Sequence, residues 1–323
     1  MPRHTLGLHI FRRDLRLHDN TALLRALSEC EQVLPVFIFD PRQANPNKNP
    51  YFSAPAFAFM IESLCELDAE LRKKGSRLYV LEGEPEKVIT KLIRDDGVQA
   101  IYVNRDYTPF ARARDASIEN VCSKAHVPFT ACDDLALSPI TTLVTQQGKP
   151  YSVFTPFVRN AMTHEVPTPK RNARVNYYRD HLNTPCTPLR DVDLNEATKP
   201  RSAGGRKAGL TLLKNTSLIT HYKHARDLPA HAGTSHLSPH HKFGTVSIRE
   251  TYEVARTHHG EGALQFVAEL YWRDFYYHIA HHFPHVFGKS FLPWGDHIAW
   301  HNDPAALTAW QIGETGIPIV DAG

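Results

Sequence analysis

Residues 266–278, with the sequence FVAELYWRDFYYH, carry a carboxylate, an indole, a guanidinium and a phenol. Their spacing of i, i+3, i+4 and i+7 places four of these side chains on one face of an α-helix: Glu269, Trp272, Arg273 and Tyr276. Such a face can bind a flat heteroaromatic ligand, because an indole stacks on a base for roughly 1–3 kcal/mol and a glutamate accepts a hydrogen bond from an imide N–H. The alternative is a surface ion pair beside a half-buried tryptophan.

A second candidate site is the segment 233–250, GTSHLSPHHKFGTVSIRE, in which a glycine precedes three hydroxyl side chains. Thr234, Ser235 and Ser238 can cradle a phosphate at a helix start, where short hydroxyls and free backbone amides favour an anion. The same residue types satisfy the first amides of many ordinary helices. The composition of the segment therefore leaves a phosphate site and a plain helix N-cap both open.

Four histidines lie close together at the end of the first candidate segment, but they do not have the pattern of a metal site. His278, His281, His282 and His285 are interrupted by Pro284, and no carboxylate stands at ligand spacing beside them. The five cysteines are scattered without a CxxC pair. This indicates reduced thiols, and we predict neither a disulfide framework nor a metal.

The elements that must position these residues begin with an alternating pattern in the first 135 residues. Five apolar runs predict strands: 6–11, 33–39, 78–81, 101–103 and 128–131. Helical patterns lie between them, and the one over 57–71 ends at Gly75. Another has Pro85 in its first turn and Gly97 after its last. Strands that alternate with helices predict an α/β fold with a doubly wound parallel sheet.

The remainder of the chain has a different pattern. Prolines recur through residues 136–203 and predict an extended connector without long regular elements. GGRKAG at 204–209 follows this connector, so we predict that it starts a helix. We predict an α/β domain over 1–135, a linker over 136–203 and an all-α domain over 204–323. The last residues, TGIPIVDAG, are typical of the opening of another helix, so we expect the second domain to be incomplete here.

The net charge is +3, but the basic residues are unevenly distributed. Seven of them occur from Lys199 to Arg226 with no acidic residue among them, which suits either a solvated helix face or a polyanionic partner. No stretch approaches the roughly 20 apolar residues that cross a bilayer, and the N-terminus has no apolar signal core. We expect a cytoplasmic monomer without a membrane or an obligate protein partner.

Six segments together resemble the cryptochrome/photolyase family, and most closely its class I cyclobutane pyrimidine dimer (deoxyribodipyrimidine) photolyases: FRRDLRLHDNTAL, YVNRDYTPFARARD, GGRKAGL, HYKHARDLPAHAGTSHLS, ELYWRDFYYHIAHHFP and AWQIGETGIPIVDAG. They follow the order of the family over nearly the whole chain. The resemblance implies a Rossmann-like N-terminal domain, a long linker and a helical domain that binds FAD without a covalent bond. It also implies UV-damaged DNA as the partner, with the protein at the nucleoid when bound.

The resemblance assigns a role to individual residues around the cofactor. The positions that match residues gripping the phosphates and the ribityl chain of the flavin are Tyr222, Thr234, Ser235, His236, Leu237 and Ser238. Phe266 matches an aromatic contact to the flavin, often tryptophan in relatives. Arg226 matches a contact to the DNA backbone.

The same resemblance implies how the first candidate segment would act. Glu269, Arg273 and Tyr276 would contact both the cofactor and the DNA. Glu269 would also hydrogen-bond the damaged pyrimidine and stabilise its radical anion, and Trp272 would stack on the flipped dimer. Trp300 would be the surface end of a tryptophan chain that photoreduces the flavin. The implied activity is light-driven repair, in which photoexcited reduced FAD passes one electron to the flipped lesion and splits its cyclobutane ring.

Two departures from the family pattern affect the cofactors. Relatives often carry an antenna chromophore, a folate or a deazaflavin, and folate binders tend to have Glu where this sequence has Thr108. The identity of an antenna therefore stays open. Further pocket segments of the family lie beyond Gly323, so we expect weak flavin retention and negligible repair from these residues alone.

Three functions remain as hypotheses. Glu269 with Trp272 favours dimer repair, since relatives that repair other photoproducts or act in signalling commonly carry Gln at the position of Glu269. The alternatives are a cryptochrome-type blue-light photoreceptor or a single-strand-preferring photolyase. A third hypothesis, from another class, is an α/β module that binds a free nucleotide at the sheet edge without any dependence on light.

Three arginines directly follow the first predicted strand: Arg12, Arg13 and Arg16. A solvated turn is one interpretation of such a charge run. The resemblance places the motif beside the interface of the two domains. We therefore expect at least one of the three arginines to pair with acidic groups there and to support the architecture.

Overall fold

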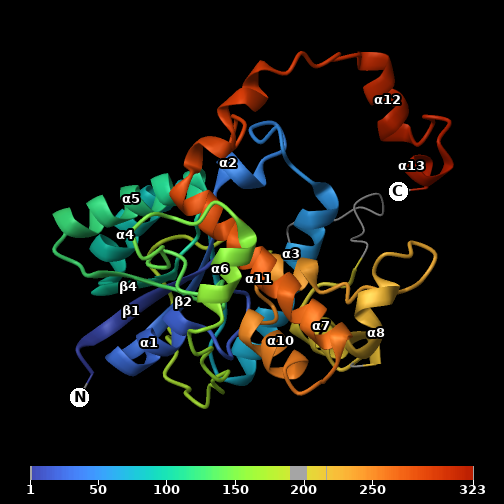
Figure 1. The fold of residues 1–323 in the computed structure, drawn as a ribbon. Helices are drawn as coiled ribbons and strands as arrows, with labels where there is room; N and C mark the ends of the chain where they lie inside the picture. Colours follow the sequence, from blue (N-terminus) through green and yellow to red (C-terminus); the bar gives the residue numbers. More distant parts are fainter. Residues whose placement is uncertain (1, 190–201, 216, 323) are drawn as a thin grey trace. The chain divides into compact units, whose positions relative to one another are not determined.

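The computed structural model describes residues 2–189, 202–215 and 217–322 (Figure 1). Contacts divide the chain into two compact units, Met1–His282 and Phe283–Gly323. No helix in the described residues is long and apolar enough to span a bilayer. The smaller unit contains two 3-10 turns, Pro284–Val286 and Pro293–His297, followed by α12 (Pro304–Ile312) and α13 (Pro318–Asp321).

A parallel sheet forms the centre of the larger unit. Its strands are β1 (His4–Phe11), β2 (Cys30–Phe39), β3 (Tyr79–Glu82), β4 (Ala100–Asn104) and β5 (Phe129–Cys132). They are arranged in the order β3-β2-β1-β4-β5, with every neighbouring pair parallel. The predicted α/β fold is confirmed. The strand order reverses between β1 and β4, and open α/β sheets bind ligands beyond the carboxyl ends of their strands at such a point.

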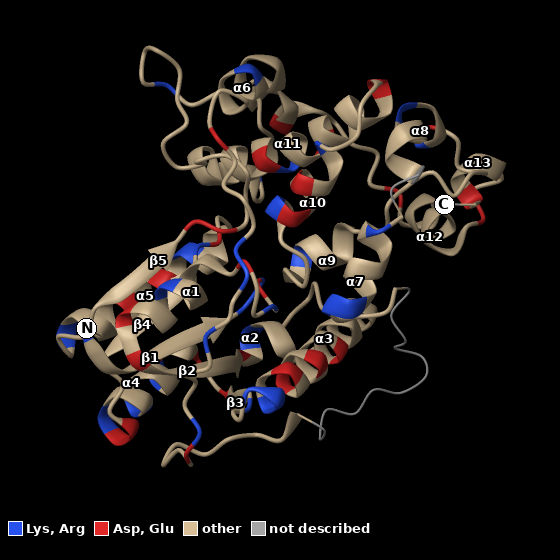
Figure 2. Cartoon of the chain, turned by 90° about the horizontal axis from the view of Figure 1, so that it is seen from below, with Lys and Arg blue, Asp and Glu red and all other residues tan. Residues whose placement is uncertain are grey.

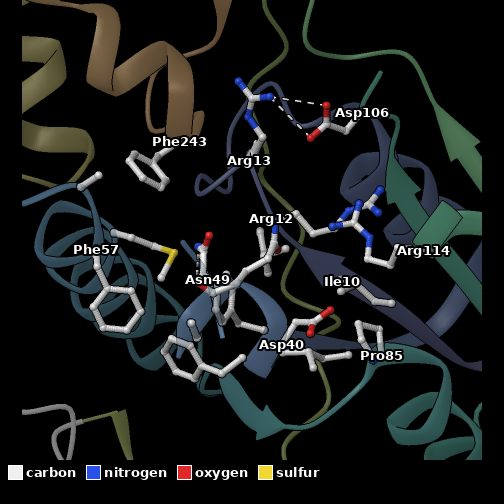
Figure 3. Close-up of a pocket in the computed structure, with 18 of the residues that line it drawn as sticks. Ile10, Arg12, Arg13, Asp40, Asn49, Phe57, Pro85, Asp106, Arg114 and Phe243 are labelled. Atoms are coloured by element: carbon white, nitrogen blue, oxygen red, sulfur yellow. Dashed lines mark hydrogen bonds and ion pairs between the residues drawn. The ribbon is translucent and has the colours of Figure 1, made fainter. Parts of the chain in front are cut away.

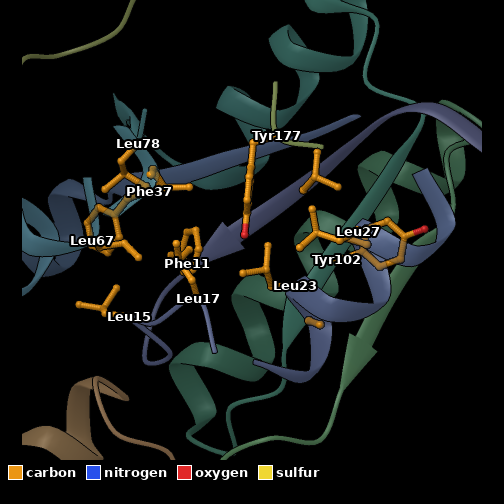
Figure 4. Close-up of a cluster of buried hydrophobic side chains, with 14 of the residues drawn as sticks. Phe11, Leu15, Leu17, Leu23, Leu27, Phe37, Leu67, Leu78, Tyr102 and Tyr177 are labelled. Carbon is orange, nitrogen blue, oxygen red and sulfur yellow. The ribbon is translucent and has the colours of Figure 1, made fainter. Parts of the chain in front are cut away.

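Helices cover both faces of the sheet, because the central strands carry consecutive buried residues that face both sides. The covering helices are α1 (Thr21–Glu29), α3 (Ala54–Lys73), α4 (Pro85–Asp96) and α5 (Pro109–Lys124). Helices α1 and α3 share a buried cluster with one face, in which Phe11, Leu23 and Tyr102 take part (Figure 4). Helices α4 and α5 cover the other face, where Leu8 packs with Ile89.

Local sequence explains where these helices begin and end. Asn20, Ser53 and Thr108 are the N-caps of α1, α3 and α5, and each accepts a hydrogen bond from the amide three residues later. Gly97 follows α4 with φ of 70°, a left-handed conformation that glycine adopts without strain. The helices predicted over 57–71 and between Pro85 and Gly97 are both confirmed.

The proline-rich connector is mostly irregular over residues 136–189, as predicted, with one short helix, α6 (Phe154–Ala161). Near its end the connector returns to the sheet. Tyr177 bridges to Val33 and is buried in the cluster beneath α1 and α3. Residues 190–201 of the predicted linker lie outside the described part of the chain. The predicted domain boundaries stay predictions.

Helices and turns make up the described residues after 202. The helices of the larger unit are α7 (Arg206–Leu213), α8 (Ser217–Ala225), α9 (Ser238–Phe243), α10 (Ile248–Ala255) and α11 (Glu261–His282). GGRKAG starts α7 as predicted. The Gly204 amide donates to Glu62 at 2.6 Å and the Lys207 amide donates to Glu66 at 2.8 Å, so carboxylates of α3 occupy this helix start. Figure 2 shows acidic positions along α3, which contacts α7.

A buried ion network ties the end of β1 to the helical part of the larger unit. Arg16 and Arg249 of α10 both pair with the Asp134 carboxylate, at 2.5 and 2.7 Å. Arg249 also pairs with Asp19 at 2.9 Å. All four side chains are buried. The expectation that an arginine after the first strand pairs with acidic groups is confirmed, and its support of the architecture stays a prediction.

Candidate cofactor and nucleic-acid site

The predicted chemical face lies on α11, a continuous helix of 22 residues. This helix packs so closely on α8 that Gly262 is required, since a Cβ there would lie 2.2 Å from the Thr220 carbonyl oxygen. Ala263, Phe266 and Leu270 of α11 are buried. The close packing therefore fixes the candidate side chains of α11 relative to α8.

Glu269 contacts the neighbouring helix as well as its own. Its carboxylate forms an ion pair with Arg226, just beyond the last turn of α8, and accepts a hydrogen bond from Gln265 at 2.7 Å. The Arg226 guanidinium lies over the Tyr222 ring, 5.7 Å from its centre, and Tyr222 packs edge-on against Phe266 at 5.1 Å. The structure thus brings together side chains for which flavin, DNA and lesion contacts were predicted separately.

Trp272 lies one turn further along α11 and stacks on an aromatic ring that sequence reasoning missed. The ring centres of Trp272 and Phe154 of α6 are 3.6 Å apart and their planes differ by 9°. Tyr276 lies on the next turn of α11, and its ring centre is 5.9 Å from that of Trp272. The one sequence signal for this contact is the i, i+3 pair Phe154 and Phe157 in an otherwise proline-rich segment.

Arg273 is directed toward the protein backbone. Its guanidinium donates to the carbonyl oxygens of Leu135 and His241, and it lies 4.7 Å from the centre of the Tyr277 ring. These contacts join α9 and the segment after β5 to α11. Tyr276, by contrast, is 65% exposed and open to a ligand. The ligand contacts predicted for both residues stay predictions.

The predicted phosphate-binding run, residues 234–238, begins beside the end of α8. A Cβ on Gly233 would lie 2.2 Å from the Ala225 carbonyl oxygen, so only glycine permits this approach. His236 adopts a left-handed φ of 52°, and Leu237 is buried. The run is therefore held against the same helix end that carries Arg226.

The hydroxyl groups of this run are only partly used within the protein. Ser235 Oγ accepts a hydrogen bond from the Leu237 amide at 3.4 Å. The hydroxyls of Thr234 and Ser238 have no hydrogen-bond partner among the residues that the structure describes. Both residues are exposed, so their hydroxyls can bind a ligand.

Trp300 belongs to the smaller unit, between the second 3-10 turn and α12. Its side chain is exposed. The predicted role of Trp300 in photoreduction stays a prediction.

The basic stretch 199–226 is neutralised in part by acidic residues from distant segments. Arg206 pairs with Glu250 at 2.6 Å, and Lys223 of α8 pairs with Glu261 at the start of α11 at 2.8 Å. Two further members of the stretch lie outside the described residues, Lys199 and Arg201. The described part of this stretch therefore carries less unpaired positive charge than its sequence indicates.

A second candidate site is a cavity of about 280 Å³ beyond the carboxyl ends of β1 and β2, which we term the sheet-edge cavity (Figure 3). Its apolar lining includes Ile10, Phe39, Phe57, Met60 and Phe243. Its charged lining includes Arg12, Arg13, Asp40, Asp106, Arg114 and Lys242. The lining residues come from several separate segments, so no local motif marks the cavity in the sequence.

The histidines near the end of α11 are used in packing. His278 Nε2 accepts a hydrogen bond from the Tyr151 amide at 3.0 Å, and His282 Nε2 lies 3.2 Å from the Ile140 carbonyl oxygen. Burial lowers the pKa of His278 to about 4, so its ring is neutral at physiological pH. Among the described residues, no group of His, Cys, Asp and Glu side chains is arranged to hold a metal ion.

Asp274 is fully buried on the core side of α11. Its Oδ2 accepts hydrogen bonds from the amide and the hydroxyl of Ser138, both at 2.8 Å, whereas Oδ1 has no partner within the described structure. Burial raises the pKa of Asp274 to about 6, against the opposing effects of Arg273 and Ser138. The folded protein therefore binds a proton here that the unfolded chain has already released above pH 4.

We expect Asp274→Asn to stabilise the protein at pH 8 by up to about 3 kcal/mol, since the variant no longer buries a charge. The gain should be absent below pH 4, grow as the pH rises through 6 and then stay constant. Urea unfolding of both proteins from pH 4 to 8 measures it. Asp180→Asn, at an exposed aspartate, is the matched control and should show no such rise. A gain that is independent of pH would contradict the assignment.

The chain was compared with known proteins. Residues 7–172 match the DNA photolyase family, and residues 266–323 match the FAD binding domain of DNA photolyase. A deoxyribodipyrimidine photo-lyase of Halobacterium salinarum is 32% identical over 97% of this chain and 69% of its own length.

The crystal structure of an archaeal photolyase from Sulfolobus tokodaii with two FAD molecules is 42% identical, with a TM-score of 0.86 over 99% of this chain and 69% of that one. A Synechocystis cryptochrome shares the fold at 22% identity, with a TM-score of 0.85 over 100% of this chain and 70% of that one. These matches, with the parallel sheet and the α8–α11 site, show that the chain belongs to the DNA photolyase family.

Proposed function

We propose that this chain binds FAD against α8, residues 233–238 and α11, and that with this cofactor it repairs cyclobutane pyrimidine dimers in DNA. The observation that carries the proposal is the cluster of Tyr222, Arg226 and Glu269, with Trp272 one turn away. Bound FAD would supply a light-excited electron donor, which no side chain provides. The match to an FAD binding domain and the names of the relatives support the proposal.

The residues present fit a flavin nucleotide. Thr234 and Ser238 offer hydroxyls that are not used within the described structure, next to a glycine whose missing side chain lets the run pack closely against the end of α8. Short hydroxyls and exposed amides are the groups that hold phosphates in proteins. The edge-on pair of Tyr222 and Phe266 provides an aromatic wall beside them.

The side chains of α11 would recognise the lesion outside the duplex. A damaged base is poorly stacked, so its extrusion from DNA costs less than that of a normal base. Trp272 would stack on the extruded dimer, and Glu269 would accept a hydrogen bond from it. Arg226 is about one-third exposed and can exchange Glu269 for a phosphate oxygen when DNA binds.

We expect Arg226→Gln to weaken binding to undamaged DNA and to reduce the slope of log Kobs against log salt by about 1, as loss of one phosphate contact predicts. Fluorescence anisotropy with a labelled duplex from 50 to 300 mM salt measures both. Arg256→Gln is the control, because Arg256 is an exposed arginine that also pairs with a carboxylate, Glu253. Equal slopes for wild type and Arg226→Gln would remove this residue from the DNA interface.

The proposed function is tested with the chain supplied with FAD under reducing conditions. Oligonucleotides with a single thymine dimer, a (6-4) photoproduct or no lesion are bound in the dark and then exposed to blue light. Preference for the thymine dimer would support the proposal, and its light-dependent reversal would support it further and contradict the expectation of negligible repair from these residues alone. Flavin binding with a light response but no lesion preference would favour a cryptochrome-type photoreceptor. Nucleotide binding that light does not affect would favour the simple α/β module.

The sheet-edge cavity supports a second function for the same chain, the binding of a light-harvesting chromophore. Its aromatic lining suits a planar ring, and it lies at the edge of the sheet where open α/β folds bind ligands. The Sulfolobus tokodaii photolyase is described with two FAD molecules and a novel light-harvesting cofactor. Met60→Trp, which adds bulk to the cavity wall, should abolish binding of a second flavin and leave the first in place.

A further inference from the structure

Phe154 covers one face of the indole that is proposed to receive the lesion. It is the first residue of α6, which packs on α11 (Figure 1). The ring centres of Phe154 and Trp272 are 3.6 Å apart and their planes differ by 9°. Carbon atoms in contact lie about 3.5–4.0 Å apart, so the two rings lie face to face. One face of Trp272 is therefore closed to a ligand.

The packing of α6 imposes this arrangement. Two free aromatic rings prefer an offset or an edge-on geometry to a face-to-face one. Phe157, one turn further along α6, is fully buried, and its ring centre lies 5.3 Å from that of Phe275 and 5.2 Å from that of His278. These core contacts with α11 hold α6 where its first residue meets Trp272.

The chain just before α6 is also attached to α11. The Tyr151 amide donates to His278 Nε2 at 3.0 Å. The Tyr151 hydroxyl accepts a hydrogen bond from Nδ2 of Asn160, near the end of α6, at 2.9 Å. Phe154 lies between these attachment points, so its backbone is held on both sides.

Trp272 is half-buried, so part of the surface that Phe154 leaves uncovered is accessible to a ligand. A side chain that becomes immobilised when a ligand binds lowers the affinity, because its rotamer freedom is lost. An indole whose orientation is fixed beforehand avoids this cost. The stack on Phe154 fixes Trp272 in this way.

We propose that Phe154 is a positioning residue for lesion recognition: it fixes the plane of the Trp272 indole before DNA binds and restricts the dimer to the opposite face. This inference rests on the proposed function, in which Trp272 stacks on the extruded dimer. It gives the connector a part in recognition, through a residue far from α11 in the sequence.

The first experiment measures the mobility of the indole in the full chain without DNA or flavin. The other three tryptophans lie in the smaller unit, and their replacement by phenylalanine leaves Trp272 as the one indole: Trp294, Trp300 and Trp310. We expect its fluorescence anisotropy to decay at the tumbling rate of the protein. Phe154→Leu should add a faster component from rotamer motion, whereas Phe154→Tyr, which keeps the ring, should not.

The second experiment measures binding in the dark to duplexes with and without a thymine dimer, with all four tryptophans present and FAD supplied. Phe154→Leu should lower affinity for the dimer about threefold to tenfold and leave affinity for undamaged DNA within about twofold. Phe154→Tyr should restore the wild-type affinity. Phe129→Leu is the matched control, because Phe129 is also half-buried but packs with the helices α4 and α5 on the sheet. This control should keep the wild-type preference for the dimer.

The role of Phe154 and the proposed function can fail separately. A dimer preference that survives in Phe154→Leu, or an indole that is equally immobile in that variant, would overturn the role of Phe154 and leave the proposed function intact. A loss that tyrosine does not restore would also overturn it. Wild-type protein without any preference for the dimer would overturn both.

Discussion

Asp134→Ala is expected to lower the free energy of unfolding by about 3–5 kcal/mol, because removal of one partner from a buried ion pair leaves the other charge uncompensated. Asp134 pairs with Arg16 and Arg249 and also accepts hydrogen bonds from the amide and the hydroxyl of Thr21, at 3.0 and 2.7 Å. Without it, Arg249 would keep its pair with Asp19, whereas Arg16 would keep only backbone carbonyl oxygens as partners among the described residues.

The pH dependence of this variant distinguishes an electrostatic loss from a cavity. Burial alone would raise the pKa of Asp134, but the charges of Arg16 and Arg249 outweigh it and lower that pKa well below 3.8. The carboxylate therefore stabilises the fold above pH 4, and its contribution is lost as the pH falls below that value. The deficit of Asp134→Ala should be complete at pH 7 and should shrink below pH 4.

Urea unfolding at several pH values measures the effect. Asp133→Ala is the matched control, because Asp133 is the adjacent residue, is 48% exposed and pairs with Arg105 at the surface. Surface pairs contribute about 0–1 kcal/mol, so this control should stay close to wild type. If both variants lowered the free energy of unfolding equally, the buried network would contribute no more to stability than a surface ion pair.

The sheet could be predicted from the sequence because its central strands, β2, β1 and β4, are buried on both faces over most of their length. A strand such as Val33–Phe39 then appears as a continuous apolar run, and glycines and prolines mark the helices between strands. The helical face of Glu269 and Trp272 was predictable for a similar reason. Spacing along one helix determines which residues share a face.

Contacts between segments that are distant in the sequence could not be predicted from such patterns. Spacing placed Arg273 beside Glu269, but the direction of a long side chain depends on which acceptors other elements present, and Arg273 found the carbonyl oxygens of Leu135 and His241. The stack of Phe154 on Trp272 likewise depends on how the connector returns to α11. The buried Nη2 of Arg114, which has no acceptor among the described residues, could be identified only once the surrounding side chains were placed.

Glu269→Gln and Trp272→Ala should both reduce recognition of a thymine dimer, but in different ways. Trp272→Ala removes a stacking surface worth roughly 1–3 kcal/mol, so its affinity for lesion DNA should fall about tenfold to a hundredfold with little change for undamaged DNA. Trp272→Phe keeps an aromatic ring against Phe154 and should recover much of this loss. Recovery by phenylalanine separates stacking from a general loss of structure.

Glu269→Gln preserves the shape of the side chain and removes its charge. Hydrogen bonds to a charged acceptor are roughly twice as strong as neutral ones, so lesion affinity should fall about tenfold. The same change frees Arg226 from its ion pair, so affinity for undamaged DNA should stay equal or increase. The ratio of lesion affinity to undamaged-DNA affinity therefore falls. A loss of folding would lower both affinities and would not produce this pattern.

Glu261→Gln provides the matched control for this last variant. Glu261 also lies on α11 and also pairs with a basic residue of α8, Lys223, but it sits at the far end of the helix pair from Trp272. Dimer binding and light-dependent reversal, measured with FAD present, should be unchanged in Glu261→Gln. If both glutamine variants lost lesion preference equally, the effect would come from the ion pairs that join α8 to α11. A loss confined to Glu269→Gln would place lesion recognition at that carboxylate.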